Sequence, residues 1–566
     1  MPGKLKVVLC WHMHQPQYRD PLTETYRLPW SYLHIIKDYV DMAAHLEAEE
    51  GARAVVNFAP VLIEQIDDYG QQIKGFLENA VPITDPVLAA LADASFIRTE
   101  QQRKMLLEQC LKANEKHLIA RFVPFKELTD IARHALQQGA HHQSYLSHQY
   151  FRDLLIWYHL AWMGETVRRE DERVTQLMEK QYGYTQDDSR LLLTLISELC
   201  HSVIPRYRRL AESGRVELAM TPYGHPIVPL LLDIHSAKEA MPDAALPEIQ
   251  NYPGGRDRAA WHIQHGKAVF ESHFGFVPQG CWPSEGSISS EAVALFAEHG
   301  YKWVASGESV FKNSVERHGL EHEGQNVTVH RPYGLGDQPV SIFFRDDGLS
   351  DLIGFNYSDW HADDAVANLI HHLQTIAANA GDEVGNHVVS IILDGENAWE
   401  YYPENAYYFL STLYRQLSQH ADLELTTFSE VLNATESQPQ LSGLVAGSWV
   451  YGTFSTWIGD AAKNRGWDIL SEAKRVYDEV IVSLSPEQKA VAEKQLAVCE
   501  GSDWCWWFGD YNPASSVSDF EQLYRHHVGR LYQILGVEAP EYLLQSFTQG
   551  SGEPAQGGVM RRGQEI

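Results

Sequence analysis

Short apolar runs alternate with longer amphipathic stretches along most of the chain. The runs, such as KVVLCWH at 6–12 and VVSIILD at 388–394, are rich in β-branched residues, as strands are. The stretches between them place apolar residues three or four positions apart, as helices do. This rhythm predicts βα units, and hence a closed or nearly closed barrel of parallel strands. The predicted strands are 6–12, 53–58, 216–221, 279–282, 302–305, 341–345 and 388–394, with 423–427 as an eighth candidate.

One βα unit is especially clear, in the sequence VPQGCWPSEGSISSEAVALFAEHGYKWVAS. A strand ends at Trp282, and Ser287 or Ser289 is placed to cap the helix that follows. Gly300 is expected to end that helix, since glycine readily adopts the left-handed conformation found after helices. The next strand then begins near residue 302.

Two regions depart from this rhythm and predict the domain organisation. Residues 85–214 show one helical pattern after another, which predicts a helical insertion in a catalytic domain of residues 1–430. Residues 431–547 are expected to form a C-terminal helical domain that contributes to the cleft. Within it, Ser485 and Gln488 form a capping box for a helix over 486–499. The Gly-rich tail 548–566 is predicted to be flexible.

Composition narrows the classes of partner. A formal net charge of −30 repels phosphate backbones and anionic membranes, so we expect no nucleic-acid partner and no membrane binding. The six cysteines are scattered without a CxxC pair, which favours free thiols in the cytoplasm. No run of apolar residues is long enough to span a bilayer, and none resembles a signal peptide. The length is compatible with a monomer or a homodimer.

Polar residues gather at the predicted strand ends, where barrels place their reactive groups. His12 and His14 lie on one face at the end of the first strand, because side chains alternate along a strand. The other candidates are Glu217 at the start of the third strand, His225 after it, Glu285, Asp394 and Glu396. Several candidates also have a structural explanation: core imidazoles for the histidine pair, an Asx turn for Asp394 and a helix first turn for Glu285.

Two chemistries fit these residues. A metal hydrolase would use His12 and His14 with further ligands such as His225, His387 or Asp394. A glycoside hydrolase would instead use Glu285 and Asp394 as its two carboxyl groups, with aromatic rings to stack on sugars. Tryptophans cluster near the candidate acids, at 282, 399, 449, 457, 504, 506 and 507. The run SDWCWWFGDYN at 502–512 is predicted to be a surface loop.

Several motifs together resemble glycoside hydrolase family 57. They are HMHQPQY at 12–18, GRVELAMTPYGHPIVPLL at 214–231, GCWPSEGSIS at 280–289 and LDGENAWEYYP at 393–403. Further stretches resemble the amylopullulanase and α-amylase branch of this family, among them FFRDDGLSDLIGFNY at 343–357 and TFSTWIGDAAKNRGWDIL at 453–470. The resemblance covers nearly the whole chain.

The resemblance implies an incomplete (β/α)7 barrel that is followed by a helical domain and works without a metal or other cofactor. It further implies cleavage of α-glucans or maltooligosaccharides with retention of configuration, with Glu285 as nucleophile and Asp394 as general acid/base. The residues that it implies for substrate binding are His12, His14, Glu217, His225, Trp282, Glu396, Trp399, Trp449, Trp457 and Trp504. We also expect an ionised Glu396 to raise the pKa of Asp394, since like charges repel.

Several functions stay open at this point. The favoured one is hydrolysis of α-1,4 bonds, with α-1,6 bonds as a second target. A 4-α-glucanotransferase or a branching enzyme would share the same covalent intermediate and differ only in the acceptor. A metal-dependent carbohydrate deacetylase using His12 and His14 is a further alternative, and so is a glucan-binding protein without turnover.

Overall fold

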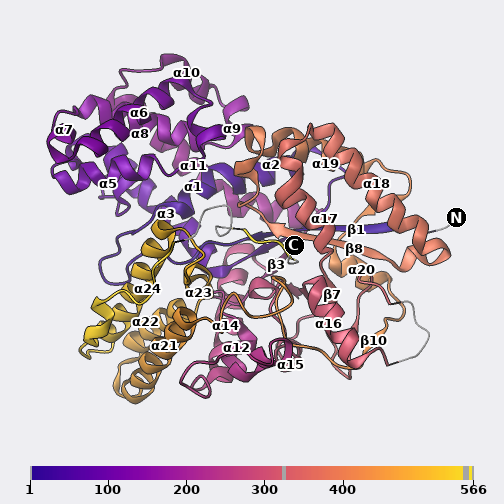
Figure 1. The fold of residues 1–566 in the computed structure, drawn as a ribbon. Helices are drawn as coiled ribbons and strands as arrows, with labels where there is room; N and C mark the ends of the chain where they lie inside the picture. Colours follow the sequence, from indigo (N-terminus) through magenta and orange to yellow (C-terminus); the bar gives the residue numbers. More distant parts are fainter. Residues whose placement is uncertain (1–2, 322–326, 552–559, 564–566) are drawn as a thin grey trace.

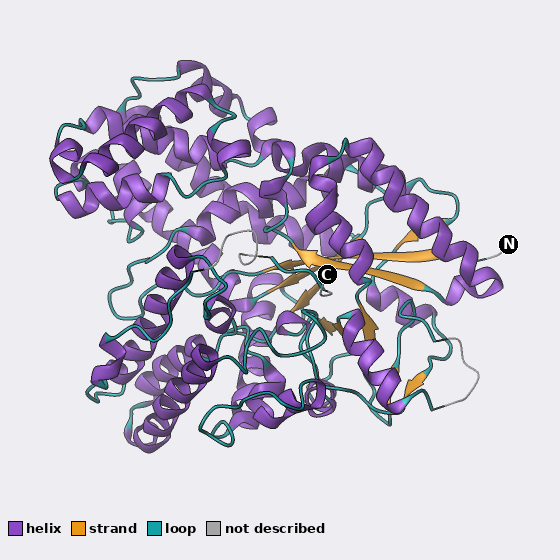
Figure 2. Cartoon of the chain, viewed as in Figure 1, coloured by secondary structure: helices purple, strands orange, loops and turns teal. Residues whose placement is uncertain are grey.

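The computed structural model describes residues 3–321, 327–551 and 560–563 (Figure 1). Its strands gather at the centre and helices surround them (Figure 2). The main strands are β1 (Leu5–Met13), β2 (Ala54–Phe58), β3 (Val216–Met220), β4 (Gly280–Cys281), β5 (Trp303–Ser306), β7 (Ser341–Phe344), β8 (Val388–Asp394) and β9 (Leu423–Leu425). Each lies within a residue or two of a strand expected from the sequence, so the predicted βα rhythm is confirmed.

All ladders between these strands are parallel. One sheet has the order β3-β2-β1-β8, with β9 paired to the start of β1, and a second has the order β4-β5-β7. A parallel bridge from Arg345 to Ser390 joins the two sheets beside β8. Between β3 and β4 the described residues form no ladder. The Asn57 side chain accepts a hydrogen bond there from the Trp282 backbone N–H, at 3.3 Å. The fold is therefore an incomplete seven-stranded α/β barrel, as predicted.

The strands are buried along nearly their whole length. Every residue of β2 is buried, and β1 is buried from Val7 to Met13. Burial on both faces is typical of parallel sheets, because crossover helices cover the outside while neighbouring strands fill the inside. Consistent with this packing, all six cysteines are free thiols. Among the described helices, none combines the length and the apolar character needed to cross a bilayer.

A lobe of helices separates β2 from β3 and stands off from the strands in Figure 1. It runs through residues 86–212, inside the predicted insertion 85–214, whose domain boundaries stay a prediction. Its helices are α4 (Pro86–Ala92), α5 (Glu100–Cys110), α6 (Val123–Gln138), α7 (Ala140–Ser144), α8 (His148–Trp162), α9 (Glu165–Glu170), α10 (Glu172–Lys180) and α11 (Gln186–Glu212).

The region after β9 is mostly helical, as expected. Its helices are α21 (Ala461–Val480), α22 (Pro486–Cys499), α23 (Asp503–Trp507) and α24 (Ala514–Ile534). The capping box of Ser485 and Gln488 forms as predicted, and in the clear βα unit Ser289 caps its helix. The region also contains a strand, contrary to the purely helical pattern that the sequence predicts there, because β10 (Gln440–Leu441) pairs with β6 (Gly334–Leu335).

One local prediction in this region is wrong. Residues 503–507 of the run SDWCWWFGDYN form a short helix, α23, rather than a surface loop, and Trp504, Trp506 and Trp507 are buried there. Polar residues flank the run, but burial of its three indoles removes a large apolar area from water, so this part of the run packs inward. In the tail 548–566, Gly563 forms backbone hydrogen bonds with Tyr451 and Asp351, and the flexibility of this tail stays a prediction. Residues 552–559 and 564–566 of that tail lie outside the described residues.

A buried ion pair fastens α14 (Gly255–Phe274) to the end of α22. The Arg258 guanidinium donates to both oxygens of Glu500, at 2.8–3.1 Å, and His262 and Tyr252 contact the same carboxylate. Burial raises the pKa of Glu500, but Arg258 and His262 outweigh it and lower that pKa to about 2. A fully hydrogen-bonded buried pair of this kind is costly to break from one side.

We predict that Arg258→Met lowers the stability of the protein by about 3 kcal/mol, because it leaves the Glu500 charge buried without its partner. Arg256→Met is the matched control on the same helix, since Arg256 pairs with Glu298 at the exposed surface, where an ion pair contributes about 0–1 kcal/mol. Thermal unfolding midpoints measure both variants.

The lowered pKa of Glu500 stabilises the fold above pH 4.5, and this contribution disappears as the pH falls toward 2. The difference between wild type and Arg258→Met should therefore shrink in acid, and equal midpoints for the two variants at neutral pH would contradict the account.

Candidate active site

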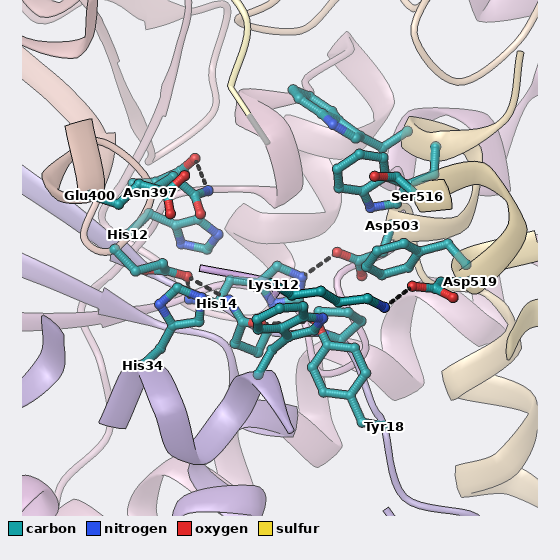
Figure 3. A pocket seen from close by; sticks show the side chains of 18 of the residues that line it. His12, His14, Tyr18, His34, Lys112, Asn397, Glu400, Asp503, Ser516 and Asp519 are labelled. Atoms are coloured by element: carbon teal, nitrogen blue, oxygen red, sulfur yellow. Dashed lines mark hydrogen bonds and ion pairs between the residues drawn. The ribbon is translucent and has the colours of Figure 1, made fainter. Parts of the chain in front are cut away.

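A cavity of about 450 Å³ opens at the carboxyl ends of β1 and β8 (Figure 3). Its size is that of a small-ligand pocket. Four parts of the chain supply its walls: the barrel ends, the helix α1 (Trp30–His34), the helical lobe before α11 and the helices α23 and α24. The lining residues include His12, His14, Gln15, Tyr18, Trp30, Lys112, Asn114, Trp162, Glu285, Asp394, Glu396, Asn397, Asp503, Trp506, Trp507, Ser516, Asp519 and Phe520.

Glu285 lies on a sharp turn just beyond β4. Its φ is +58°, which is uncommon for a residue with a side chain and marks stored backbone strain. Trp449 holds both ends of this residue: its backbone N–H donates to the Glu285 carbonyl at 3.0 Å and its Nε1 donates to Oε2 at 2.9 Å. The turn therefore aims the carboxylate into the cavity.

Asp394 is the last residue of β8, and its partner on β1 is His12. The parallel register therefore brings these two side chains to the same edge of the barrel. The next residue, Gly395, donates its N–H to the His12 carbonyl at 2.7 Å. A Cβ at Gly395 would lie 2.2 Å from the Met13 sulfur, so only glycine allows this close approach. The Asn397 amide donates to Asp394 Oδ2 at 2.9 Å.

The two carboxyl groups are electrostatically linked. Burial, and then the Asp394 charge, raise the pKa of Glu285 to about 8, although the Trp449 indole lowers it in part. Burial also raises the pKa of Asp394, against the effect of the Asn397 amide. Two carboxylates that face each other in a low dielectric cannot both ionise easily. The pair therefore keeps one proton at a pH where ordinary carboxyl groups have none.

Glu396 does not act on Asp394 as expected from the sequence. Its Oε1 accepts the His14 backbone N–H at 3.1 Å and the Gln15 amide at 3.3 Å. Burial, and then the Asp394 charge, raise the pKa of Glu396 well above its ordinary value. A neutral Glu396 carries no charge to repel Asp394, and burial is the main cause of the Asp394 shift.

Hydrogen bonds fix the tautomers of two buried histidines. Asn57 accepts the Trp282 N–H with its oxygen, so its amide nitrogen, 2.8 Å from His12 Nδ1, is a donor. His12 must then carry its proton on Nε2 and donate it to His225 Nε2, 3.1 Å away. His225 in turn donates from Nδ1 to the Ser502 hydroxyl at 2.8 Å. That same Nδ1 lies 3.9 Å from Glu285 Oε1. Burial is the main cause that lowers the pKa of both imidazoles, so this chain is neutral.

The cluster of His12, His14 and His225 raises the metal hypothesis again, since their nitrogens lie within 4.8 Å of one another. The His14 ring, however, stacks on the His225 ring with centroids 3.8 Å apart and planes 16° apart. Lone pairs of stacked rings point in parallel directions and do not converge on one ion. His14 Nε2 instead contacts Asp503 Oδ1 at 2.8 Å (Figure 3). This arrangement favours an organic ligand over a three-histidine metal centre.

The structure brings together some of the predicted binding residues and separates others. His12, His14 and Glu396 line the cavity with the two acids, and His225 and Trp449 contact Glu285 from behind. The Trp282 ring packs beneath the turn at Gly286.

Glu217 is the clearest departure from the sequence-based expectation. It is the second residue of β3, near the end of the barrel opposite the cavity. Its carboxylate accepts Trp303 Nε1 at 2.7 Å and the Ser429 backbone N–H at 2.9 Å, which holds two elements of the barrel together. Trp399, Trp457 and Trp504 are also outside the cavity walls: Trp399 packs on Trp11, and the side chains of Trp457 and of Trp504 in α23 are fully buried in the core.

Sequence reasoning missed the walls that come from distant helices. Trp30 and Trp162 supply apolar faces from the helical side, and Trp507 stacks on Phe520 of α24. An ion pair from Lys112 to Asp519, 2.5 Å long, joins the helical lobe to α24 across the cavity (Figure 3). No local motif marks these residues, and their positions follow only from how the lobe and the C-terminal helices pack.

Comparison with known proteins agrees with this geometry. A family model described as glycosyl hydrolase family 57 matches residues 8–443. The chain belongs to this family. Membership in family 57 indicates an enzyme that acts on glucans. Comparison with curated proteins finds no match.

Solved structures of family 57 share this fold. The branching enzyme of Pyrococcus horikoshii is 15% identical with a TM-score of 0.57, covering 95% of this chain and 93% of its own. The α-amylase AmyC of Thermotoga maritima is 14% identical with a TM-score of 0.56, covering 96% and 95%. The 4-α-glucanotransferase of Thermococcus litoralis is 14% identical with a TM-score of 0.51, covering 94% of this chain and 60% of its own. At such identities the likeness shows the fold alone.

We predict that Trp449→Phe moves the acid limb of kcat/KM to higher pH. The indole N–H stabilises the ionised Glu285, so its loss raises the pKa of that carboxyl group further. A hydrogen bond to a charged group corresponds to about 10- to 100-fold in kcat/KM on the acid side. A pH profile with maltoheptaose measures this. Trp157→Phe is the control, because Trp157 donates to the Gln181 carbonyl in the helical lobe. Identical profiles for the two variants would refute the role of Trp449.

Proposed function

We propose that this protein is a retaining α-glucan hydrolase that cleaves α-1,4 glucosidic bonds, with Glu285 as nucleophile and Asp394 as general acid/base. The observation that carries the proposal is the pair itself: two partly buried carboxyl groups line one cavity, burial raises the pKa of both, and the Asp394 charge raises the pKa of Glu285 further. A retaining glycosidase needs one ionised and one protonated carboxyl group, about 5–5.5 Å apart.

The surroundings of the two acids support this division of roles. Glu285 accepts the Trp449 indole N–H, which favours its ionised form. In the free site the Asp394 charge raises the pKa of Glu285, and the proposal assigns the proton of the pair to Asp394 in the reactive complex with substrate. In the first step Glu285 attacks the anomeric carbon while Asp394 transfers its proton to the departing glycosidic oxygen. The Glu285 charge is thereby lost, and Asp394 leaves the step as a carboxylate.

The second step follows from that loss of charge. Without a facing anion, the ionised Asp394 takes a proton from water, which attacks the glycosyl-Glu285 ester. Hydrolysis of this ester releases the sugar with its anomeric configuration retained, and both carboxyl groups return to their starting protonation states. The hydrogen-bonded chain of His12, His225 and Ser502 lies beside Glu285 and is neutral, so it adds no fixed positive charge to the site.

The cavity walls favour a sugar substrate. Indole and phenyl faces from Trp30, Trp162, Trp507 and Phe520 suit the apolar faces of pyranose rings, and Asn114, Asn397 and Ser516 offer neutral partners for hydroxyl groups. The six free thiols suit a reducing compartment, so we place the enzyme in the cytoplasm with an intracellular glucan or maltooligosaccharide as substrate. Cleavage of α-1,6 bonds is a second activity included in the proposal.

We predict that Glu285→Gln and Asp394→Asn each lower kcat on maltoheptaose by about 10³-fold or more, since each removes one reacting group. Glu291→Gln, on the exposed first turn of the next helix, is the matched control and should keep wild-type kcat. Thermal unfolding of all three variants checks that they are folded. Wild-type turnover in both site variants would refute the assignment.

Azide distinguishes the two roles. With an activated α-glucoside, Glu285→Ala should give the β-glucosyl azide, because azide attacks the sugar directly from the nucleophile's side. Asp394→Ala should give the α-glucosyl azide, because azide there attacks the glycosyl-enzyme. Proton NMR of the products reads the anomeric configuration, and exchanged outcomes would reverse the assignment.

Product analysis tests the reaction class. Short maltooligosaccharides from maltoheptaose and amylose indicate hydrolysis, and maltotriose from pullulan indicates α-1,6 cleavage. Products longer than maltoheptaose would instead show a glucanotransferase, and new α-1,6 branches would show a branching enzyme. Either result would contradict the proposed preference for water while leaving the glycosyl-Glu285 intermediate in place.

A further inference from the structure

The described end of the chain returns to the back of the active site. Residues 560–563 lie outside the segment 8–443 that matches the family model. The Tyr451 N–H donates to the Gly563 carbonyl at 3.0 Å, and the Gly563 N–H donates to Asp351 Oδ2 at 3.0 Å. These backbone bonds hold the segment beside the loop that carries Trp449.

The Gly563 backbone packs closely against the side chains of Arg345 and Asp347. A Cβ there would lie 2.7 Å from Arg345 Nη1 and 2.7 Å from the Asp347 carboxyl carbon. Arg345 is fully buried, pairs with Asp347 at 2.7 Å and lies 4.8 Å above the Trp449 ring. The segment therefore rests directly on the cluster that supports the indole bound to Glu285.

Arg561 points from this segment to the other side of the cavity wall. Its side chain is buried, with Nη1 donating to Thr456 Oγ1 at 3.0 Å and Nη2 donating to the Trp506 carbonyl at 3.2 Å. The guanidinium stacks 4.5 Å from the Trp506 ring and 4.8 Å from the Tyr511 ring. Within the described part of the chain, no carboxylate lies within 4.0 Å of it.

A buried cation without an adjacent carboxylate needs compensation elsewhere. The Trp506 and Tyr511 ring faces and the two oxygen acceptors supply part of it. The Arg561 charge in turn acts on the site, because it lowers the pKa of Glu285 against the effect of burial. Trp506 itself lines the cavity. Arg561 thus contacts one wall of the cavity, Trp506, and affects the pKa of Glu285 through its charge.

We propose that Arg561 is a positioning residue of the active site, which holds the Trp506 indole as a wall of the sugar cleft and whose positive charge favours the ionised form of Glu285. This inference rests on the proposed function. It assigns to residues 560–563 a part in substrate binding that their sequence, MRRG, does not indicate.

The test compares Arg561→Met, Arg561→Lys and the control Arg562→Met, whose guanidinium lies against Phe355. Arg561→Met should raise KM for maltoheptaose about tenfold, since a desolvated cation–π contact is lost, and should move the acid limb of kcat/KM to higher pH. Arg561→Lys keeps the charge but not the planar fork, so KM rises while the acid limb stays. Arg562→Met should match wild type in both.

Two further measurements complete the test. Calorimetric binding of maltoheptaose is measured beside turnover, and thermal unfolding reports on folding. Wild-type KM, binding and acid limb in Arg561→Met would overturn the proposal. If that variant does not fold, Arg561→Lys decides: a raised KM supports the proposal and a wild-type KM overturns it. A wild-type enzyme that binds but does not cleave refutes the hydrolase function, while weaker binding in Arg561→Met still supports the role of Arg561.

Discussion

The repulsion between two carboxyl groups, Glu285 and Asp394, is the constraint on which the site depends. They line one cavity, where burial raises the pKa of both and the Asp394 charge raises the pKa of Glu285 further. Such an arrangement opposes folding unless other parts of the structure hold it. Here the strained turn at Glu285, the buried strand before Asp394 and the indole of Trp449 do so. The shared proton that results is what glycosidic cleavage requires.

Separate regions of the chain contribute separate parts of this site. The barrel supplies the two acids and the neutral histidine chain, since parallel strands bring distant sequence segments to one edge. The helical lobe and the C-terminal helices supply aromatic walls and meet at the Lys112–Asp519 ion pair. The chain end reaches the same place through Arg561. Chemistry is thus concentrated in the barrel, whereas the shape of the cleft depends on helices that belong to other segments.

Much of the barrel could be predicted because its signal is local. Apolar runs such as 388–394 are buried on both faces, so their composition alone marks them as strands. The acids at strand ends follow from the same pattern. The placement of Glu217 could not be predicted in this way, because a motif shows proximity in sequence but not which end of a strand faces the cavity. The sequence predicts a loop at α23 because polar residues flank it, whereas the three indoles of this helix are buried by partners that lie far away in the sequence. Likewise, nothing near Lys112 or Arg561 indicates the surfaces that they reach.

Trapping the covalent intermediate tests the central claim most directly. Incubation with 5-fluoro-α-glucosyl fluoride should let the glycosyl-enzyme form and then hydrolyse slowly, so that intact-mass spectrometry detects one added sugar. Proteolysis and fragmentation of the labelled protein should locate that sugar on Glu285. A sugar attached to Asp394, or steady turnover of the reagent with no trapped protein, would contradict the account.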